Sequence, residues 1–113
     1  MAAGGDLDRE AIAKAFEAAV NMTPGEIADW LDTDESRKVG FRRGGSGESV
    51  GHASGRRIVA ILCKPRPERD DDDYRHMRKV VGYVKRHKAQ EPANVATSRW
   101  RYSLMNWGHD PLK

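Results

Sequence analysis

One stretch of the chain, residues 70–90, would place five positive charges on a single face of a helix. They are Arg75, Arg78, Lys79, Lys85 and Arg86. With Tyr74 set at 0°, the five fall between about 20° and 140° around the helix axis. Cations gathered on one face attract phosphate groups. The pattern predicts a phosphate-binding face on which Gly82 permits close approach; an ordinary solvated face, or a Gly82 that admits a neighbouring helix, is the alternative.

Further cations come from other segments of the chain. They are Arg42, Arg43, Arg56, Arg57, Arg99 and Arg101. We expect Arg42 and Arg43 to form a flexible strap that orders on binding, and Arg56 and Arg57 to form a second basic set. The stretch GGSGES at residues 44–49 lacks the lysine and the glycine spacing of a phosphate-cradling loop. Nucleotide binding at that loop is therefore not expected.

Catalytic chemistry has less support from the sequence. The candidate nucleophiles, bases and metal ligands are His52, His76, His87, His109 and Cys63. Their spacing matches no zinc signature, and His76 and His87 would lie about 16 Å apart along one helix. Together with Tyr83 these two histidines could offer rings to a sugar or a base. Cys63 is interpreted as a small core residue. We predict no enzyme, no metal, no cofactor and no small-molecule substrate.

Charge is divided by position along the chain. Residues 1–36 carry nine acidic residues against Arg9 and Lys14, a net charge of −7, whereas residues 37–113 carry a net charge of +10. The overall charge of +3 therefore conceals an acidic part and a basic part. The basic part favours a polyanionic partner. The acidic part could fold back over the basic face and compete with nucleic acid.

Length and composition indicate one small domain. The 113 residues allow a single core, and no apolar run approaches the roughly 18 residues of a membrane span. Cys63 is the only cysteine, so no internal disulfide can form. We expect one domain overall, residues 6–113. Within it we distinguish an acidic helical arm (1–36), a mobile basic glycine-rich loop (37–55) and a basic helical body (56–113). A cytoplasmic, nucleoid-associated setting is expected.

Hydrophobic periodicity and capping signals predict about five helices and a mostly α fold. The first helix runs from about Asp6 to Val20, and we expect it to pack by the alanine-lined face of Leu7, Ala11, Ala15 and Ala19. In the second helix, Thr23 and Glu26 form a capping box, and the acids that follow Leu31 end the helix.

The remaining helices have clear boundary signals. A third helix begins with Ser54 as its N-cap and ends before Pro65, although its apolar run also suits a buried strand. The acids at the start of the 70–90 helix complement its dipole. A last helix runs from Thr97 or Ser98 to Trp107, where Gly108 stops it. Its core side is expected to hold Trp100, Leu104 and Trp107.

Four segments also carry a resemblance to a known family. They are MTPGEIADWLDTDESRKVG, GESVGHASGRRIVAIL, DDDYRHMRKVVGYVKRH and SRWRYSLMNWGHDPLK. Together they resemble the small microbial proteins of the family known as domain of unknown function 3140, from about Val20 to Lys113. The resemblance implies a DNA-binding protein and assigns no catalytic residues.

The function that the sequence predicts is nucleic-acid binding. DNA is favoured over RNA, and we expect contacts with the backbone of double-stranded DNA and little sequence preference. The alternative is a protein-interaction or self-association module whose basic part binds an acidic partner. Homo-oligomer formation is left open, and no membrane association is expected.

Overall fold

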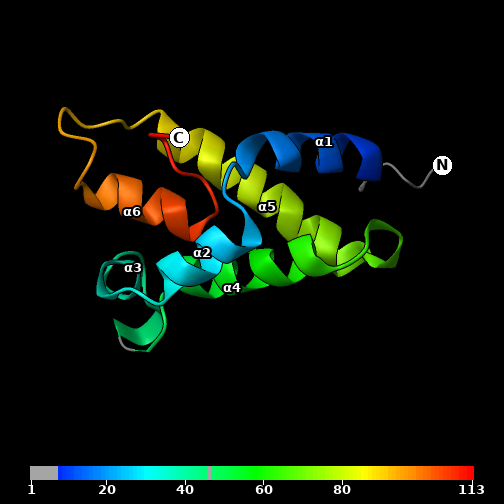
Figure 1. Ribbon diagram of the computed structural model, residues 1–113, viewed down its shortest axis with the longest axis horizontal. Coiled ribbons are helices and arrows are strands. Elements are labelled where there is room, and N and C mark those ends of the chain that lie inside the picture. The colour runs from blue at the N-terminus through cyan, green and yellow to red at the C-terminus, as the bar shows by residue number, and fades with distance from the viewer. Residues whose placement is uncertain (1–7, 46) are drawn as a thin grey trace.

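The computed structural model describes residues 8–45 and 47–113, and over these residues the chain is helical and contains no strand (Figure 1). Its elements are α1 (Arg9–Ala19), α2 (Pro24–Leu31), α3 (Asp34–Lys38), the 3₁₀ helix η1 (Arg43–Gly45), α4 (Val50–Cys63), the 3₁₀ helix η2 (Arg66–Glu68), α5 (Asp71–Lys88) and α6 (Arg99–Asn106). The predicted small, mostly α fold is confirmed. Within the described ranges, no helix has the length and apolar character needed to cross a membrane.

Local capping sets several helix boundaries as the sequence predicts. The Thr23 hydroxyl accepts the Glu26 amide at 3.1 Å, and the Glu26 carboxylate accepts the Thr23 amide at 2.8 Å. Asp70 and Asp73 form the same reciprocal pair at the start of α5, with distances of 2.9 and 3.0 Å. Each such cap stabilises its helix by about 1 kcal/mol. Gly108, with φ of +81°, follows α6.

All the long helices contribute to one core. Figure 1 shows α1 beside α5 and α2 against α4, with α6 at one end of the bundle. The acidic N-terminal helices α1 and α2 therefore hold part of the same core as the basic helices. The least exposed core side chains are Ala13, Phe16, Ile27, Ile58, Met77, Val80 and Leu104.

The packing face of α1 differs from the prediction. Ile12, Ala13 and Phe16 are buried, whereas Ala11 is exposed. Larger apolar side chains remove more area from water, so the face that holds Ile12 and Phe16 turns toward the core. The expectation of an alanine-lined contact is wrong for this reason. Leu7, which belonged to the expected face, lies outside the described residues.

The start of α4 also differs from the prediction. The helix begins at Val50, where Ser49 is the N-cap and its hydroxyl accepts an amide of the first turn at 3.0 Å. Ser54, predicted as the cap, is buried inside the helix, and so is Gly55. A Cβ atom on Gly55 would lie 2.6 Å from the carbonyl oxygen of Asn106, so the glycine lets α4 approach α6 closely. Two of the glycines that suggested a loop, Gly51 and Gly55, are therefore helix-contact residues, whereas Gly40, Gly44, Gly45 and Gly47 precede the helix and have positive φ.

The short helix α3 was not predicted. Thr33 caps it by accepting the Ser36 amide at 3.1 Å, and Ser36 is buried. Asp34 and Glu35, which correctly signalled the end of α2, also supply negative charge to the first turn of α3. A helix of five residues is too short for a hydrophobic period to reveal it.

Replacing Gly55 by alanine is expected to destabilise the protein by about 1–3 kcal/mol, because the new methyl group would overlap Asn106 and Leu31 atoms. Chemical denaturation of the full chain measures this change. Gly25→Ala is the matched control, since nothing lies within 4 Å of a Cβ built on that helical residue. A Gly55→Ala protein as stable as the Gly25→Ala protein would contradict the proposed close contact.

Candidate functional site

The helix α5 presents its cations on the side opposite the core. Tyr74, Met77, Val80 and Val84 are buried on one face, and Val81 beside them is half-buried. The five predicted cations are all exposed. They are Arg75, Arg78, Lys79, Lys85 and Arg86, and we call them the basic face. The helix therefore separates an apolar face from a charged one.

Gly82 lies in the middle of the basic face and is not a helix-packing glycine. A Cβ atom built on it would meet only the guanidinium of Arg86, at 3.0 Å, among the described atoms. The interpretation that Gly82 admits a neighbouring helix is therefore wrong within this chain. A glycine inside a helix costs about 0.5–1 kcal/mol relative to alanine, so the gap in side-chain cover lowers the stability of the helix.

Three cations of the basic face have no protein counter-charge. Over the described part of the chain, Lys79, Lys85 and Arg86 make no ion pair and no hydrogen bond through their side chains. Arg75 pairs with Asp72 at 2.8 Å, but both side chains are exposed, and such a pair contributes little. The basic face thus keeps most of its positive potential.

The second predicted set, on α4, is largely neutralised. Arg56 makes a two-pronged ion pair with Glu48, with N–O distances of 2.8 and 2.5 Å. The hydrogen bonds from Arg56 are the main reason why the pKa of Glu48 falls to about 2. Arg57 contacts the buried carboxylate of Asp73 at 3.4 Å. Burial alone would raise the pKa of Asp73, but Lys64, at 2.7 Å, and its other hydrogen bonds lower it to about 2.

The predicted strap is partly tied to its own loop. Arg42 donates to the carbonyl oxygen of Gly47 at 2.7 Å and to that of Arg37. These bonds hold its guanidinium against the loop that joins α3 to α4. The side chain of Arg43 lies outside the described part of the structure. Whether the strap orders on binding stays a prediction.

The two arginines of α6 have different surroundings. Arg101 is half-buried and binds Asp110 through two N–O contacts of 3.1 Å, and it also donates to the carbonyl oxygen of Ala96 at 2.8 Å. This arginine ties α6 to the C-terminal segment. Arg99 is exposed and makes no ion pair among the described residues. Of the two, Arg99 is therefore the residue with charge available for a partner.

Aromatic rings of α5 and α6 interleave in one stack, which we call the aromatic column. Its order is His76, Trp107, Tyr83, His87 and Trp100, with neighbouring ring centres 6.3, 4.2, 5.1 and 6.3 Å apart. The rings of His76, Tyr83 and His87, which we expected could be offered to a sugar or a base, are half-buried and stack within the molecule on Trp107, on Trp100 or on one another. Trp100 and Trp107 are buried, as predicted.

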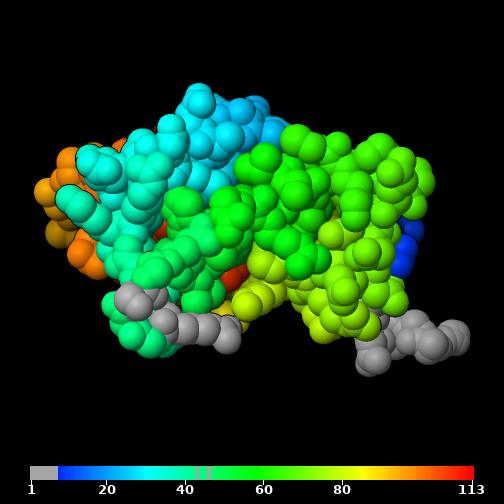
Figure 2. Space-filling model, turned by 90° about the horizontal axis from the view of Figure 1, so that it is seen from below, coloured from blue at the N-terminus to red at the C-terminus, as the bar shows by residue number. Residues whose placement is uncertain are grey.

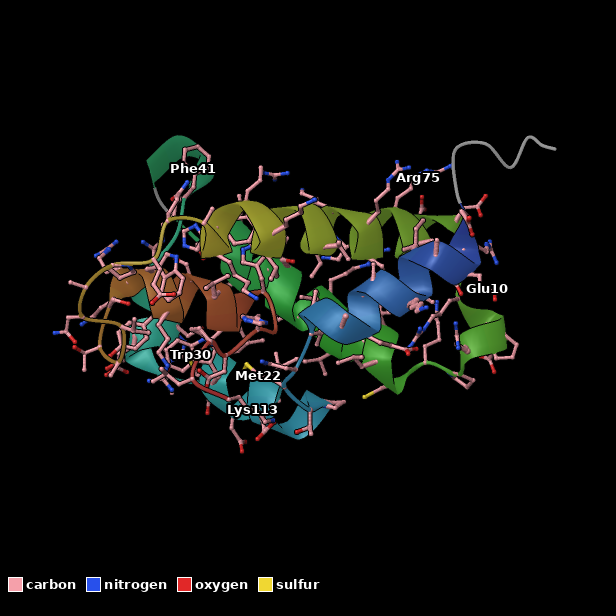
Figure 3. The ribbon with its side chains drawn as sticks, turned by 90° about the horizontal axis from the view of Figure 1, so that it is seen from above. Glu10, Met22, Trp30, Phe41, Arg75 and Lys113 are labelled. Atoms are coloured by element: carbon pink, nitrogen blue, oxygen red, sulfur yellow. The ribbon has the colours of Figure 1, made fainter. Side chains whose placement is uncertain are left out.

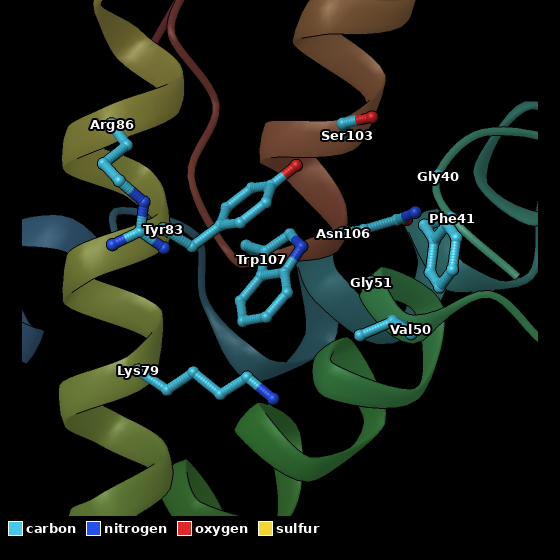
Figure 4. Close-up of a pocket in the computed structure, with 10 residues that line it drawn as sticks. All are labelled: Gly40, Phe41, Val50, Gly51, Lys79, Tyr83, Arg86, Ser103, Asn106 and Trp107. Carbon is cyan, nitrogen blue, oxygen red and sulfur yellow. The ribbon is translucent and has the colours of Figure 1, made fainter. Parts of the chain in front are cut away.

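A pocket of about 230 Å³ opens between the aromatic column and the start of α4 (Figure 4). Figure 2 shows the corresponding face of the molecule hollowed between α4 and α5. Two cations of the basic face line the pocket, and no acidic residue does among the described residues. The lining residues are Gly40, Phe41, Val50, Gly51, Lys79, Tyr83, Arg86, Ser103, Asn106 and Trp107. No local signal predicted this site, because its walls come from four distant segments.

The residues considered for catalysis are dispersed. Cys63 is exposed at the last position of α4, so its interpretation as a core residue is wrong. His52 lies between the Glu48 carboxylate and the carbonyl oxygen of Leu31, the latter at 2.7 Å. In the described ranges, no three His, Cys, Asp or Glu side chains are grouped as metal ligands.

Three acidic side chains of the described N-terminal segment pair with residues that are not part of the basic face. Asp32 pairs with Arg37 at 2.7 Å, Glu17 contacts Arg66 at 3.8 Å, and Glu26 pairs with the C-terminal lysine. The helix α1 lies beside α5 in Figure 1 and contributes its apolar face to the core. Competition of the acidic part with nucleic acid remains a prediction, and charge substitutions test it better than deletion, which would remove core residues.

The stability of the protein is expected to fall between pH 6.5 and 4, partly because of His76. Burial, followed by the positive charges of Arg57 and Lys79, lowers the pKa of His76 from 6.5 to about 4. The neutral ring therefore contributes its full stability above pH 6.5, and this contribution disappears as the pH falls toward 4. Because the ring is partly exposed, solvent screens the effect, and the decline amounts to about 1–2 kcal/mol.

Urea denaturation at several pH values measures this dependence. His76→Gln should flatten the decline. Part of the decline should remain because burial also lowers the pKa values of the half-buried His87 and the buried His109. An equal decline in the variant and the natural protein would contradict the role of His76.

Comparison with known proteins agrees with the resemblance that the sequence carries. No curated protein and no solved structure matches the chain. One family matches residues 15–105, which include the whole of α2 to α5 and most of α6. The chain therefore belongs to the family described as Protein of unknown function (DUF3140).

Proposed function

We propose that this protein binds nucleic acid, double-stranded DNA in particular, through the basic face of α5. The observation that carries the proposal is the exposed row of cations in which Lys79, Lys85 and Arg86 have no counter-charge among the described residues. Cations on the other helices are largely paired, as Arg56 is with Glu48. The positive potential is thus concentrated on one helix.

The dimensions of α5 suit contact with a phosphate backbone. Its 18 residues extend for about 27 Å at 1.5 Å per residue. Duplex DNA carries one negative charge per roughly 1.7 Å of axis, so several phosphates lie within reach of one such helix. Gly82 leaves the centre of the basic face without side-chain cover, which allows the strand to approach the helix backbone.

The proposed contacts carry little sequence information. Arginine and lysine side chains on phosphates fix position and orientation, whereas sequence is read by contacts with base edges. We therefore propose weak sequence preference and strong dependence on salt. DNA is favoured over RNA in this proposal because a straight exposed helix fits the wide major groove of B-form DNA better than the narrow groove of RNA.

An acidic protein is the second candidate partner. Phe41 is 71% exposed and lies beside the pocket that Lys79 and Arg86 also line, and an aromatic residue next to cations is typical of protein interfaces. Such a partner would compete with DNA for the same cations. The absence of duplex binding at low salt, together with recovery of an acidic protein, would favour this function.

Neutralising three cations of the basic face is expected to weaken DNA binding and its salt dependence. In the variant Arg75→Gln, Arg78→Gln, Lys85→Gln, none of the changed residues lines the pocket. The slope of log affinity against log salt should shrink by about 0.9 for each phosphate that the variant no longer binds, up to three units. Fluorescence anisotropy with a random-sequence duplex, with single-stranded DNA and duplex RNA as competitors, measures both quantities.

The matched control removes the same charge from other surfaces: Lys14→Gln, Arg66→Gln, Lys113→Gln. Figure 3 shows Arg75 and Lys113 at opposite edges of the molecule. The control should keep nearly the same slope as the natural protein. Equal slopes for the two triple variants would show that binding follows net charge rather than the basic face.

Replacing Gly82 by alanine should stabilise the protein and weaken DNA binding at the same time. Alanine favours the helix by about 0.5–1 kcal/mol, and the methyl group meets only the flexible end of Arg86. The same methyl group would hold a phosphate strand farther from the helix backbone. Thermal unfolding and anisotropy on one preparation test both effects. Unchanged DNA affinity in a stabilised variant would rule out close approach at Gly82.

A further inference from the structure

The three tryptophans differ in what their indole N–H groups contact. Trp30 donates to the side-chain oxygen of Asn106 at 2.7 Å, and Trp100 donates to the carbonyl oxygen of His87 at 2.6 Å. Trp107 is only 4% exposed, yet its indole nitrogen has no acceptor among the described residues. Among the described residues, only His87 Nε2 is a buried side-chain nitrogen or oxygen without a partner. The Trp107 nitrogen is therefore reachable from outside the core, and an acceptor could bind to it there.

The free indole N–H of Trp107 belongs to the pocket between α4 and α5. In Figure 4 the nitrogen is on the side of the ring that faces Gly51 and Phe41. A Cβ atom on Gly51 would lie 3.0 Å from this nitrogen, so glycine leaves the space in front of the N–H group open. Any larger residue at position 51 would fill the place that an acceptor needs.

The other groups of the pocket that can reach a ligand are also donors. Gly51 is the second residue of α4, and its backbone N–H has no partner among the described residues. The positive end of the α4 dipole therefore points to the pocket. Lys79 and Arg86 line the opposite wall and lack counter-charges within the described part of the chain. In contrast, both polar atoms of the Asn106 side chain are already hydrogen-bonded.

The pocket holds hydrogen-bond donors, the positive end of a helix dipole and two cations, and no carboxylate lines it among the described residues. These groups favour the binding of an anion. The volume of about 230 Å³ is below the roughly 300–1,000 Å³ of sites that enclose a whole small molecule, so the pocket suits one group of a larger ligand. Phe41, which is 71% exposed at the pocket, offers a ring face to whatever is attached to that anion.

We propose that this pocket binds the phosphate group of a nucleotide, with its base stacked on Phe41. The phosphate accepts hydrogen bonds from the indole N–H of Trp107 and the amide of Gly51, while Lys79 and Arg86 balance its charge. The nucleotide is either free or part of a strand with an unpaired base. The identity of the carrier rests on the proposed nucleic-acid function, whereas the phosphate site itself stands on the geometry of the pocket.

Nuclear magnetic resonance of the full chain tests the site directly, because each tryptophan gives one indole N–H signal. Trp107→Phe assigns the Trp107 signal. The natural protein is titrated with inorganic phosphate, with a nucleoside 5′-monophosphate and with a short single-stranded oligonucleotide at constant ionic strength. The Trp107 signal should shift and saturate, while the signals of Trp30 and Trp100 stay in place. No Trp107 shift with any of the three probes would overturn the proposal.

Two glycine variants distinguish phosphate binding in the pocket from nonspecific attraction by the cations. Gly51→Ala places a methyl group against the Trp107 nitrogen and should abolish the shift, although all cations remain. Gly25→Ala changes the same position of another helix, where a Cβ meets nothing within 4 Å, and should leave the shift intact. If Gly51→Ala does not fold, Lys79→Gln replaces it and should weaken phosphate binding several-fold. Full phosphate binding by a folded Gly51→Ala protein would overturn the site.

The probes also identify the carrier of the phosphate. Stacking on an aromatic ring contributes about 1–3 kcal/mol, so the nucleotide should bind at least about fivefold more tightly than inorganic phosphate. Phe41→Ala should remove this difference and leave the response to inorganic phosphate. Equal binding of both probes by the natural protein would overturn the nucleotide assignment. Tighter binding of the oligonucleotide than of the monophosphate identifies a strand as the source, and the reverse identifies a free nucleotide.

The site and the proposed function can fail separately. The triple variant Arg75→Gln, Arg78→Gln, Lys85→Gln should keep the Trp107 response, since none of these residues lines the pocket. A Trp107 response to phosphate in a protein that binds no duplex would reject the nucleic-acid function and support the site. Duplex binding without a Trp107 response would support the nucleic-acid function and reject the phosphate site.

Discussion

Asn106 joins four helices from a position that is only 1% exposed. Its side-chain oxygen accepts from Trp30 of α2 at 2.7 Å and from Ser36 of α3 at 2.5 Å, and its amide group returns a hydrogen bond to the Ser36 carbonyl at 3.1 Å. Its backbone carbonyl lies against Gly55 of α4. A satisfied buried network of this kind specifies one arrangement of the surrounding helices. The end of α6, the pocket beside it and the start of α4 all depend on that arrangement.

Acidic residues form ion pairs with some cations and leave others without an ion-pair partner among the described residues. Glu48 and Asp73 are placed against the arginines of α4, and Asp110 is placed against Arg101. Each of these pairs links two segments of the chain and therefore supports the fold. On α5 the acids are confined to the first turn, where they face the helix dipole. Charge on the remaining turns is thus available for interactions outside the molecule.

Local signals allowed the mostly α fold and most of the helices to be predicted, but tertiary contacts decided the rest. The cap at Thr23 could be predicted because a capping box depends on residues three positions apart, whereas the acids at the start of α5 were predicted only to complement the dipole. Ser54 was predicted as the cap of α4 from its residue type alone, but the cap is Ser49, and Ser54 and Gly55 lie inside the helix where Gly55 packs against α6. The pocket was beyond sequence reasoning because no spacing indicates that the indole N–H of Trp107 lacks an acceptor.

The aromatic column gives α5 and α6 a fixed register. Three of its rings, His76, Tyr83 and His87, come from α5, and the other two come from Trp100 of α6 and from Trp107, the residue that follows α6. A slip of one segment along the other would separate the three ring pairs that join them, and only the Tyr83–His87 pair, which lies within α5, would remain. Rings fixed in this manner give a chiral signal in the near ultraviolet that disappears when packing becomes fluid. The column is therefore a built-in optical reporter of whether the wall of the pocket is intact.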